Sequence, residues 1–391
     1  MNLFSLTISA SIADFTKEKR SFLWKRKNEC SLHPGDEDSE MKIAVDAMGG
    51  DFAPQSVVEG AVGAAKNHGI KVILVGDEDQ VSKELSKYPI SKLPIYIHHA
   101  PHVVAMHDSP STVIRKMKDT SIKVAIDLAK GGEAEAVVSA GNSGAAMALA
   151  MYIFKKIEGV DRPAIATIHP TPKGSTILVD SGGNVDCKPS HLVQFAIMGD
   201  AYAKYILRRS EPKIGVLSNG EEEGKGNELT RGAHDHLSKT NMHYVGYVEG
   251  RDLNSGQVDV IVCDGFVGNV ALKISEGLWD TIHAILKWEA QDNIRAKVAY
   301  FLMIRAIRRL EKRLDYSEYG GAPLLGINGS CVICHGASNA KAIMNAIVLA
   351  SELAENKLSE HLYQELMERQ ELLRLGQKGQ EKVAENTKPI P

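Results

Sequence analysis

A turn without ionisable side chains joins an apolar segment to a helical one near the middle of the sequence. The segment VVSAGNSGAAMALA covers residues 137–150, and its turn contains Gly141, Asn142, Ser143 and Gly144. A glycine-rich turn that leads into a helix presents free backbone N–H groups and the positive end of the helix dipole, which together bind phosphate. The turn lacks the G-x-G-x-x-G pattern and the P-loop lysine, so a nicotinamide cofactor and a P-loop nucleotide are disfavoured. Inorganic phosphate and the phosphopantetheine of a carrier stay open as ligands.

Similar polar turns follow other apolar segments of the chain. The residues of these turns that we expect to line a ligand site are Asp46, Gly49, Gly50, Asp51, Asn184, Asp186, Lys225, Asn227, Asp264 and Asn269. Each Asn, Asp or Gly has a simpler explanation, because turns and helix N-caps favour these residue types. A cap needs one residue per turn, whereas these turns carry several. We therefore predict that the turns form one binding site, at a single edge of a sheet.

Nucleophilic catalysis and metal binding have weaker support in the sequence. Cys187 lies in the turn SGGNVDCKP, where it could attack a thioester, but a small residue in a polar loop is the simpler interpretation. Cys331 and Cys334 lie three residues apart in an apolar strand, so their side chains point to opposite faces and cannot easily share a metal. We predict no metal site and no cofactor.

Short apolar segments alternate with helical patterns from residue 41 onward. The segments are KIAVD, KVILVG, AEAVVS, STILVD, KIGVLS, VDVIVC and SCVIC. Continuous apolar runs of this length are typical of parallel strands that helices cover on both faces. The sequence therefore predicts an α/β fold with three layers and a doubly wound, mostly parallel sheet. In such sheets ligands bind beyond the carboxyl ends of the strands, where the polar turns would lie.

The composition indicates a large protein with balanced charge. The chain has 391 residues, 43% of them hydrophobic, and a formal net charge of −3, which argues against a dedicated nucleic-acid binder. Its five cysteines are few and odd in number, which fits a reduced, cytoplasmic protein better than a disulfide framework. No apolar run approaches the roughly 20 residues that a transmembrane helix needs.

The ends of the chain differ from the alternating region between them. Residues 1–40 are polar, mixed in charge and without useful periodicity, so we interpret them as a disordered extension or the product of a start codon placed too early. Residues 41–355 form the predicted α/β domain. Residues 356–391 are expected to form a C-terminal helix and a polar tail.

One stretch interrupts the strand–helix alternation, and we predict a helical hairpin at about residues 286–318. Residues 298–304 form an unbroken apolar cluster. The basic residues that follow it at helical spacing are Arg305, Arg308, Arg309, Lys312 and Arg313. An apolar cluster of this length cannot span a bilayer, but it can enter the surface while basic residues meet anionic headgroups. The alternatives are a hairpin that packs in a dimer interface, and arginines that dock an acidic partner protein.

Several long motifs of the sequence are those of a known family. In chain order they include MKIAVDAMGGD, VSAGNSGA, GVDRPAIA, NVDCKPSHLVQFAIMGDAYA, EEEGKGNELT, DGFVGNVALK and YSEYGGAPLLG. Over residues 41 to about 355, the chain closely resembles the bacterial phosphate acyltransferases, the acyl-carrier-protein:phosphate transacylases of the PlsX family. The resemblance implies a fold related to isocitrate and isopropylmalate dehydrogenases and phosphotransacetylases, with the predicted hairpin protruding from it.

The resemblance also implies a reaction and a set of partners. Acyl carrier protein (ACP) loaded with an acyl chain and inorganic phosphate would give acyl phosphate and holo-ACP, for phospholipid (phosphatidic acid) synthesis. The expected protein is a cytoplasmic homodimer, peripherally associated with the membrane through residues 298–313. This membrane interpretation is favoured because the product must reach a downstream membrane glycerol-3-phosphate acyltransferase. The remaining alternatives are a dehydrogenase of the related fold and a non-catalytic, membrane-associated scaffold.

The reaction requires positioning and charge stabilisation more than acid–base machinery. A thiol leaving group has a pKa of about 8.5, so it departs without strong acid catalysis. We predict that Lys225 stabilises the phosphate charge or the oxyanion and that Asn227 orients the reactants. Asp46 and Asp264 would orient Lys225 or cap their own loops. The residues expected to donate to phosphate are Asn142 and Ser143, and those expected to line the site are Asn184, Asp186 and Asn269.

Overall fold

The computed structural model describes residues 41–369, apart from residues 117 and 293. The predicted extension at residues 1–40 and the polar tail after residue 369 lie outside the described residues. The strands are β1 (Lys42–Asp46), β2 (Lys71–Gly76), β3 (Ile95–His99), β4 (Ala136–Ser139), β5 (Ala164–Thr171), β6 (Gly174–Val179), β7 (Ile214–Leu217), β8 (Tyr244–Val248), β9 (Val260–Val262), β10 (Ala322–Leu325) and β11 (Ser330–Ile333).

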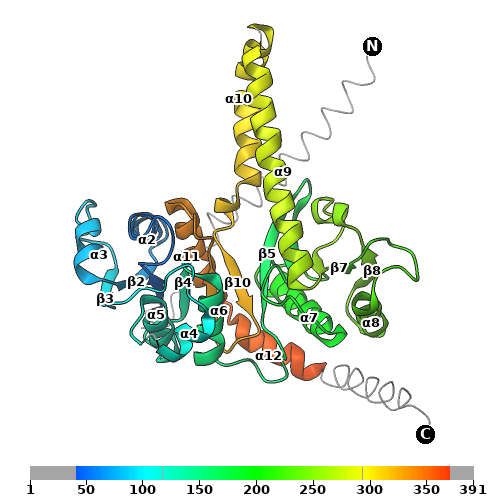
Figure 1. Ribbon diagram of the computed structural model, residues 1–391, viewed down its shortest axis with the longest axis horizontal. Helices are drawn as coiled ribbons and strands as arrows, with labels where there is room; N and C mark the ends of the chain where they lie inside the picture. The colour runs from blue at the N-terminus through cyan, green and yellow to red at the C-terminus, as the bar shows by residue number, and fades with distance from the viewer. Residues whose placement is uncertain (1–40, 117, 293, 370–391) are drawn as a thin grey trace. The chain divides into compact units, whose positions relative to one another are not determined.

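Helices connect most of these strands, as the alternation in the sequence predicts (Figure 1). The α-helices are α2 (Gln55–His68), α3 (Glu78–Leu85), α4 (Pro110–Lys116), α5 (Ser121–Lys130), α6 (Ser143–Ile153), α7 (Pro189–Tyr205), α8 (Glu228–Leu237), α9 (Gly265–Asp292), α10 (Ile294–Leu314), α11 (Ala340–Glu355) and α12 (Leu358–Glu368). Two short 3₁₀ helices are η1 (Gly250–Asn254) and η2 (Tyr316–Glu318). Each of the seven predicted apolar segments contains a strand.

The described strands form one 11-stranded sheet, in the order β3-β2-β1-β4-β11-β10-β5-β6-β9-β7-β8. Most neighbouring strands are parallel. The three antiparallel pairs are β11–β10, β10–β5 and β5–β6, so the direction of the strands reverses across the middle of the sheet. The sequence patterns predicted neither β5 nor β10, and these two strands make the reversal.

Helices cover both faces of the sheet, which confirms the three-layer prediction (Figure 1). On β1, Ile43 and Val45 pack in a core cluster that includes α2, α7 and α11. Ala44 points to the other face, into a cluster with α5 and α6. Alternate residues of one apolar strand are therefore buried in different layers, which explains why the segment has no polar face.

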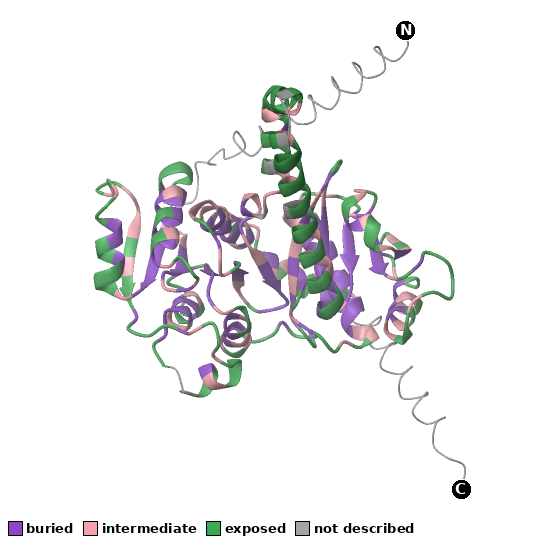
Figure 2. Cartoon of the chain, turned by 45° about the horizontal axis from the view of Figure 1, so that its top comes forward, coloured by how far each residue is buried: buried purple, intermediate pink, exposed green. Residues whose placement is uncertain are grey.

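The predicted hairpin is formed by α9 and α10, which project away from the sheet (Figure 1). Helix α9 begins at Gly265, so the hairpin is longer than the predicted residues 286–318. Figure 2 shows that most of its length is exposed. The exposed large apolar side chains of the hairpin are Phe266, Val267, Val270, Ile274, Leu278, Ile282, Ile285, Leu286, Trp288, Val298, Phe301, Leu302, Met303 and Leu310. In the described part of the chain, no helix has the length and apolarity that crossing a membrane requires.

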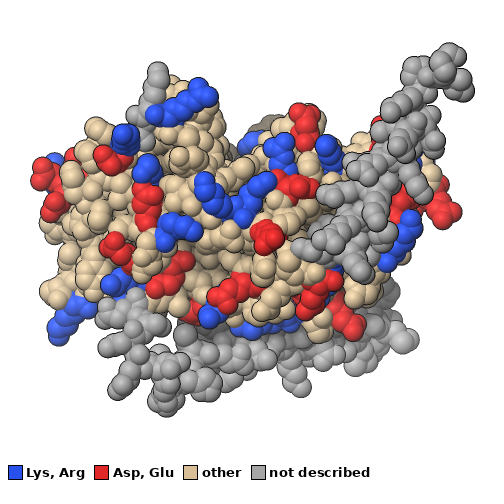
Figure 3. Space-filling model, turned by 90° about the horizontal axis from the view of Figure 1, so that it is seen from below, with Lys and Arg blue, Asp and Glu red and all other residues tan. Residues whose placement is uncertain are grey.

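The charged side chains on the face shown in Figure 3 are of both signs. Lysines and arginines are interspersed there with aspartates and glutamates. This mixture agrees with the small net charge and does not provide the single-sign surface that a nucleic acid would require on this face.

Candidate active site

The polar turns fall into two groups, because the two parts of the sheet run in opposite directions. Three successive antiparallel pairings separate β11 from β6. The carboxyl ends of β1, β4 and β11 therefore lie at one edge, and those of β6, β7 and β9 lie at the opposite edge. The prediction that all the turns share one sheet edge is wrong. We call the turns after β1, β4 and β11 the first turn group, and those after β6, β7 and β9 the second turn group.

In the first turn group, Asp46 joins the ends of β1 and β4. Its carboxylate is buried, and Oδ2 accepts a hydrogen bond of 2.7 Å from the Ser139 hydroxyl. Oδ1 accepts from Met48 N at 3.3 Å. Burial raises the pKa of Asp46, while its hydrogen bonds oppose that shift. Asp46 therefore holds the turns of this group together.

The glycines of the first turn group allow the backbones to approach closely. A Cβ atom at Gly49 would lie 2.7 Å from Gly141 N and 2.5 Å from Asp46 Oδ2. Gly50 has a φ of +109°, which side chains rarely adopt. The following residue, Asp51, donates its backbone N–H to Gly336 O at 2.8 Å. These contacts bring the turns after β1, β4 and β11 together, and the binding role of Gly49, Gly50, Asp51 and Gly141 stays a prediction.

The side-chain amide of Asn142 is engaged within the protein. Its Oδ1 accepts from Ala145 N at 3.0 Å and so caps helix α6. Its Nδ2 lies 3.2, 3.0 and 2.9 Å from the carbonyl oxygens of Ala105, Met106 and Asp108. The amide thus fastens the loop at residues 105–108 to the start of the helix, and it has no hydrogen left for a ligand.

The first turn of α6 still offers donors for an anion. Ser143 and Gly144 are exposed, and they are the first two residues of the helix. Their backbone N–H groups lie among the four that a helix start leaves without intrahelical partners. Together with the Ser143 hydroxyl, they can hold a phosphate at the positive end of the helix dipole.

The second turn group is organised by Asp180, a residue that the sequence analysis missed. Asp180 Oδ1 accepts from Ile165 N at 2.9 Å and from Gly183 N at 3.0 Å. Oδ2 accepts from Asn184 N at 2.6 Å and from Asn184 Nδ2 at 2.8 Å. Burial raises its pKa, against the effect of these hydrogen bonds. The signal in the sequence was an aspartate at a strand end, two residues before the pair Gly182-Gly183.

Asn184 is buried and is part of the same framework. Its Nδ2 also donates to Pro163 O at 2.7 Å, and its own carbonyl accepts from Gly265 N at 2.7 Å. The second bond joins the turn after β6 to the start of α9. Asn184 therefore supports the site from inside, and its amide is not directed to a ligand.

Asn269 and Asp186 remain accessible in the second turn group. Both side chains are exposed. A Cβ atom at Gly182 would lie 3.8 Å from Asn269 Oδ1, so Asn269 lies beside the glycine turn. Asp264 accepts from Val267 N at 2.9 Å and caps the start of α9. Of the two predicted roles for Asp264, capping is the one that the geometry displays.

Lys225 and Asn227 lie in the turn after β7. Lys225 is exposed, and Nζ lies 4.0 Å from Glu222 Oε2. Within the described residues it forms no ion pair with Asp46 or Asp264. Asn227 Oδ1 accepts from Thr230 N at 2.9 Å, as the N-cap of α8. The lysine is thus exposed to solvent beside Glu222, while the asparagine stabilises the helix that follows it.

Helix α6 connects the two turn groups. A Cβ atom at Gly183 would lie 3.3 Å from Met147 Sδ, one turn into α6. The helix that begins in the first turn group therefore contacts the glycine turn of the second. The two turn groups are therefore connected through α6, although they lie at opposite edges of the sheet.

Among the cysteines that the structure describes, the candidate nucleophile Cys187 is not activated, and Cys331 and Cys334 are not arranged to share a metal. Burial, together with the charges of Asp180 and Asp264, raises the pKa of Cys187 to about 12. Its thiol is therefore protonated near neutral pH and is a poor nucleophile. Cys331 and Cys334 pack in different core clusters, which confirms that they point to opposite faces. The described residues contain no group of three or more His, Cys, Asp or Glu side chains that could hold a metal.

The strands and helices define a class of α/β proteins, those with a mostly parallel sheet that helices cover on both faces. A phosphotransacetylase from Streptococcus pyogenes superposes with a TM-score of 0.56 and 18% identity, over 81% of this chain and 94% of that one. A putative 4-hydroxythreonine-4-phosphate dehydrogenase from Salmonella typhimurium gives 0.51 and 13%, over 81% and 100%. At such identities the likeness shows the fold alone, and it confirms the predicted fold class.

Sequence comparison narrows this class to one family. A family model described as "Fatty acid synthesis protein" matches residues 41–361. The phosphate acyltransferase of Syntrophotalea carbinolica is 56% identical over 331 residues, 84% of this chain and 95% of the relative. That of Geobacter sulfurreducens is 55% identical over 326 residues, 83% and 94%. The chain belongs to the phosphate acyltransferase family and is an enzyme of the acyltransferase class, as the motifs indicated.

Proposed function

We propose that this enzyme transfers the acyl group of acyl-ACP to inorganic phosphate, giving acyl phosphate and holo-ACP for phosphatidic acid synthesis. The observation that carries the proposal is the family membership, since relatives that match 84% of the chain are named phosphate acyltransferases. The exposed start of α6 supports it, because this turn suits a phosphate.

The chemistry consists of one exchange at the thioester carbonyl. A phosphate oxygen attacks the carbonyl carbon, the C–S bond breaks, and the phosphopantetheine sulfur leaves as thiolate. Ser143 and Gly144 would hold the phosphate, while Lys225 stabilises the oxyanion and Asn269 lines the site. The protonated thiol of Cys187 argues against an acyl-enzyme intermediate.

A direct assay tests this proposal. Purified protein is incubated with hexadecanoyl-ACP and phosphate, and both acyl phosphate and free ACP thiol are measured. Equal amounts of the two products, dependent on phosphate, are the expected result. Thiol release without acyl phosphate would indicate a thioesterase and contradict the proposal. The absence of turnover would contradict the proposed acyl donor.

The hairpin would attach a cytoplasmic enzyme to the surface of the membrane. Phe301 and Leu302 are 72% and 75% exposed, in the first half of α10 and near the turn that joins it to α9. Arg305, Arg308 and Arg309 are exposed on the following turns. Apolar side chains at this end can enter the headgroup region while the arginines meet anionic lipid. This location would place acyl phosphate near the membrane glycerol-3-phosphate acyltransferase that consumes it.

The homodimer and the docking of ACP complete the proposed set of partners. The long exposed face of α9 provides apolar surface for a second copy. Light scattering of the purified protein measures the mass of the assembly, and titration with apo-ACP measures docking without turnover.

A further inference from the structure

An arginine without an assigned role lies at the sheet edge that carries the second turn group. Arg162 belongs to the motif GVDRPAIA and stands two residues before β5. Strand β5 is antiparallel to β6, with Ala166 paired to Val179, so the start of β5 lies at the carboxyl end of β6. Polar turns at the carboxyl ends of strands do not include this residue, because it precedes its strand.

The backbone on both sides of Arg162 is fixed by buried amides. Asp161 N donates to Gln194 Oε1 at 2.8 Å, and Gln194 Nε2 donates to Asp161 Oδ2 at 3.1 Å. On the other side, Pro163 O accepts from Asn184 Nδ2 at 2.7 Å. Gln194 and Asn184 are both buried. These bonds hold the arginine segment between α7 and the turn after β6.

The side chain of Arg162, in contrast, is exposed. Its guanidinium forms no ion pair and no hydrogen bond with another residue of the described ranges. Burial raises the pKa of Cys187, and the charge of Arg162 opposes that rise. Burial lowers the pKa of His191, and the charges of Arg162 and Lys188 act in the same direction. The guanidinium therefore lies near the turn after β6, and it is available to an anion.

Two further cations lie in the turns that meet here. Lys188 is exposed and directly precedes Pro189, the first residue of α7. A Cβ atom at Gly232 would lie 2.7 Å from Pro189 Cγ, so the start of α7 contacts α8. Helix α8 follows the turn that carries Lys225. Three adjoining segments of the second turn group thus each present a cation, and Arg162 is the one on the most firmly held backbone.

A guanidinium on a fixed backbone suits a phosphate, because its planar fork can donate to two oxygens at once. Both substrates of the proposed reaction carry such oxygens, one as inorganic phosphate and the other in the phosphodiester of the phosphopantetheine arm. We propose that Arg162 binds a phosphate group of one of these substrates in the second turn group, with Lys188 beside it. This inference rests on the proposed function, since it assigns a recognition residue for its substrates.

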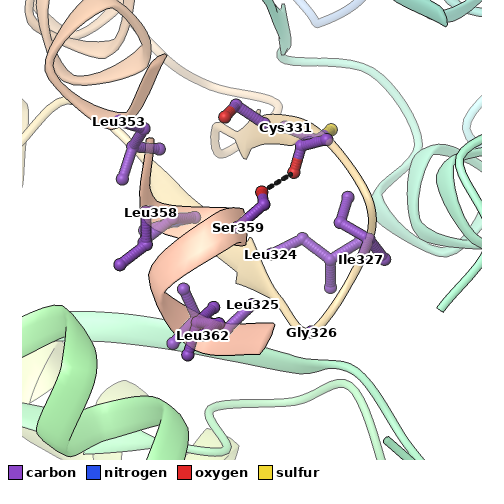
Figure 4. Close-up of a pocket in the computed structure, with 12 residues that line it drawn as sticks. Leu324, Leu325, Gly326, Ile327, Cys331, Leu353, Leu358, Ser359 and Leu362 are labelled. Atoms are coloured by element: carbon purple, nitrogen blue, oxygen red, sulfur yellow. Dashed lines mark hydrogen bonds between the residues drawn. The ribbon is translucent and has the colours of Figure 1, made fainter. Parts of the chain in front are cut away.

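An apolar recess elsewhere in the described structure does not suit this ligand. It lies between β10, β11 and α12, and Leu324, Leu358 and Leu362 line it (Figure 4). Its volume of about 10 Å³ is no larger than one water molecule requires. The Ser359 hydroxyl in its wall already donates to Gly329 O at 3.0 Å. The residues that line the recess include no cation, so a phosphate would find neither room nor charge there.

Steady-state kinetics of two variants test this proposal. In Arg162→Gln, the KM for phosphate or the KM for hexadecanoyl-ACP should rise about 30-fold, because a charge-assisted pair of hydrogen bonds is lost. Arg162→Lys keeps the charge without the fork, so its KM should lie between those of Arg162→Gln and the wild type. The control Arg208→Gln removes an exposed arginine beyond the other end of α7 and should behave as wild type. Unchanged KM values for both substrates in Arg162→Gln would overturn the proposal.

A binding measurement separates this inference from the proposed reaction, because binding does not require turnover. Calorimetry follows the titration of inorganic phosphate, 4′-phosphopantetheine and pantetheine into the wild type and into Arg162→Gln. The variant should bind one of the two phosphate compounds about 30-fold more weakly, which identifies the source of the phosphate, and pantetheine as the wild type does. This result supports the role of Arg162 even if the wild type forms no acyl phosphate. The proposal is wrong if the variant binds both phosphate compounds normally, if the wild type binds neither, or if pantetheine binding falls equally.

Discussion

Helix α7 and the α9–α10 hairpin are both rich in apolar residues, yet their surroundings are opposite. In α7, residues 191–203 are all buried, including Leu192 and Phe195. In α10, the apolar residues Phe301 and Leu302 are among the most exposed of the described chain. Figure 2 shows the contrast between the buried layers and the exposed hairpin.

The difference in burial follows from the other residues of each helix. Helix α7 is apolar on nearly all sides and packs among β6, β9, α8 and α12, as a helix inside a layer must. Helix α10 combines its apolar side chains with the exposed Arg305, Arg308 and Arg309, so it keeps a polar face. Apolar surface that stays exposed does not stabilise the fold. Its burial can instead contribute to the free energy of binding a partner. The buried α7 therefore contributes to the stability of the fold, whereas the exposed hairpin is the region that we propose to attach the enzyme to its partners.

The strongest test of this comparison removes the apolar end of the hairpin. In the double variant Phe301→Glu plus Leu302→Glu, sedimentation with anionic liposomes should be abolished, because two charged groups replace the side chains that we propose enter the membrane. Turnover of soluble acyl-ACP and the assembly mass should not change. Liposome sedimentation, the assay of acyl phosphate and light scattering measure the three properties.

A control of equal charge makes this result specific. Tyr152→Glu plus Tyr363→Glu adds the same two charges at exposed aromatic positions outside the hairpin. This control should sediment with liposomes nearly as well as the wild type. If the hairpin variant becomes monomeric or insoluble, its apolar end is an interface between copies, and the membrane proposal is wrong.

A matched pair of truncations tests the two regions by stability. Leu192→Ala in α7 removes a fully buried side chain and should lower the free energy of unfolding by about 3 kcal/mol. Leu302→Ala in α10 removes a side chain that is 75% exposed and should change it by less than about 0.5 kcal/mol. Urea unfolding followed by circular dichroism provides both values. A cost for Leu302→Ala close to that of Leu192→Ala would show that this part of α10 is already buried against another chain.

The sequence patterns predicted strands that are apolar on both faces, but they missed β5 and β10, which reverse the strand direction across the sheet. Segments such as KIAVD and KVILVG have apolar residues on both faces, and they are strands β1 and β2. Strand β5 contains His169 and Thr171 among its apolar residues, and β10 begins after two glycines. An apolar run also does not indicate the direction of its strand within the sheet. The prediction of one sheet edge was wrong for this reason.

For the candidate site as well, the sequence indicated the residue types but not the orientation of their side chains. Composition identified the polar turns, and the contacts of Gly49 and Gly141 confirm that two of them meet. Whether an amide caps a helix or faces a ligand depends on where it points, and Asn142 and Asn227 both cap helices. Asp180 was missed because it resembles the last residue of an apolar strand. The five hydrogen bonds that its carboxylate accepts from the turn and from β5 form only in the folded chain.

Substitution of Lys225 tests catalysis without touching either helix of the comparison. Lys225→Ala should lower turnover at saturating acyl-ACP about 100-fold, the scale for removing one group that stabilises a transition state. The melting temperature and liposome sedimentation should not change, because the side chain is exposed and remote from the core. The control is Lys239→Ala, an exposed lysine that follows α8 at its other end. Near-normal turnover of Lys225→Ala would remove this residue from the mechanism.

The smallest effect is expected at Cys187, which lies in the second turn group. Burial raises the pKa of its thiol to about 12, so the reactive thiolate is scarce at pH 8. Cys187→Ala should therefore retain turnover within about 2-fold, because removal of a half-buried sulfur leaves the charge-stabilising groups in place. Alkylation of the native protein by iodoacetamide at pH 8 should be much slower at Cys187 than after unfolding, as peptide mass spectrometry can measure. A loss of turnover comparable to that of Lys225→Ala, with an acylated Cys187 peptide in the wild type, would instead establish an acyl-enzyme route.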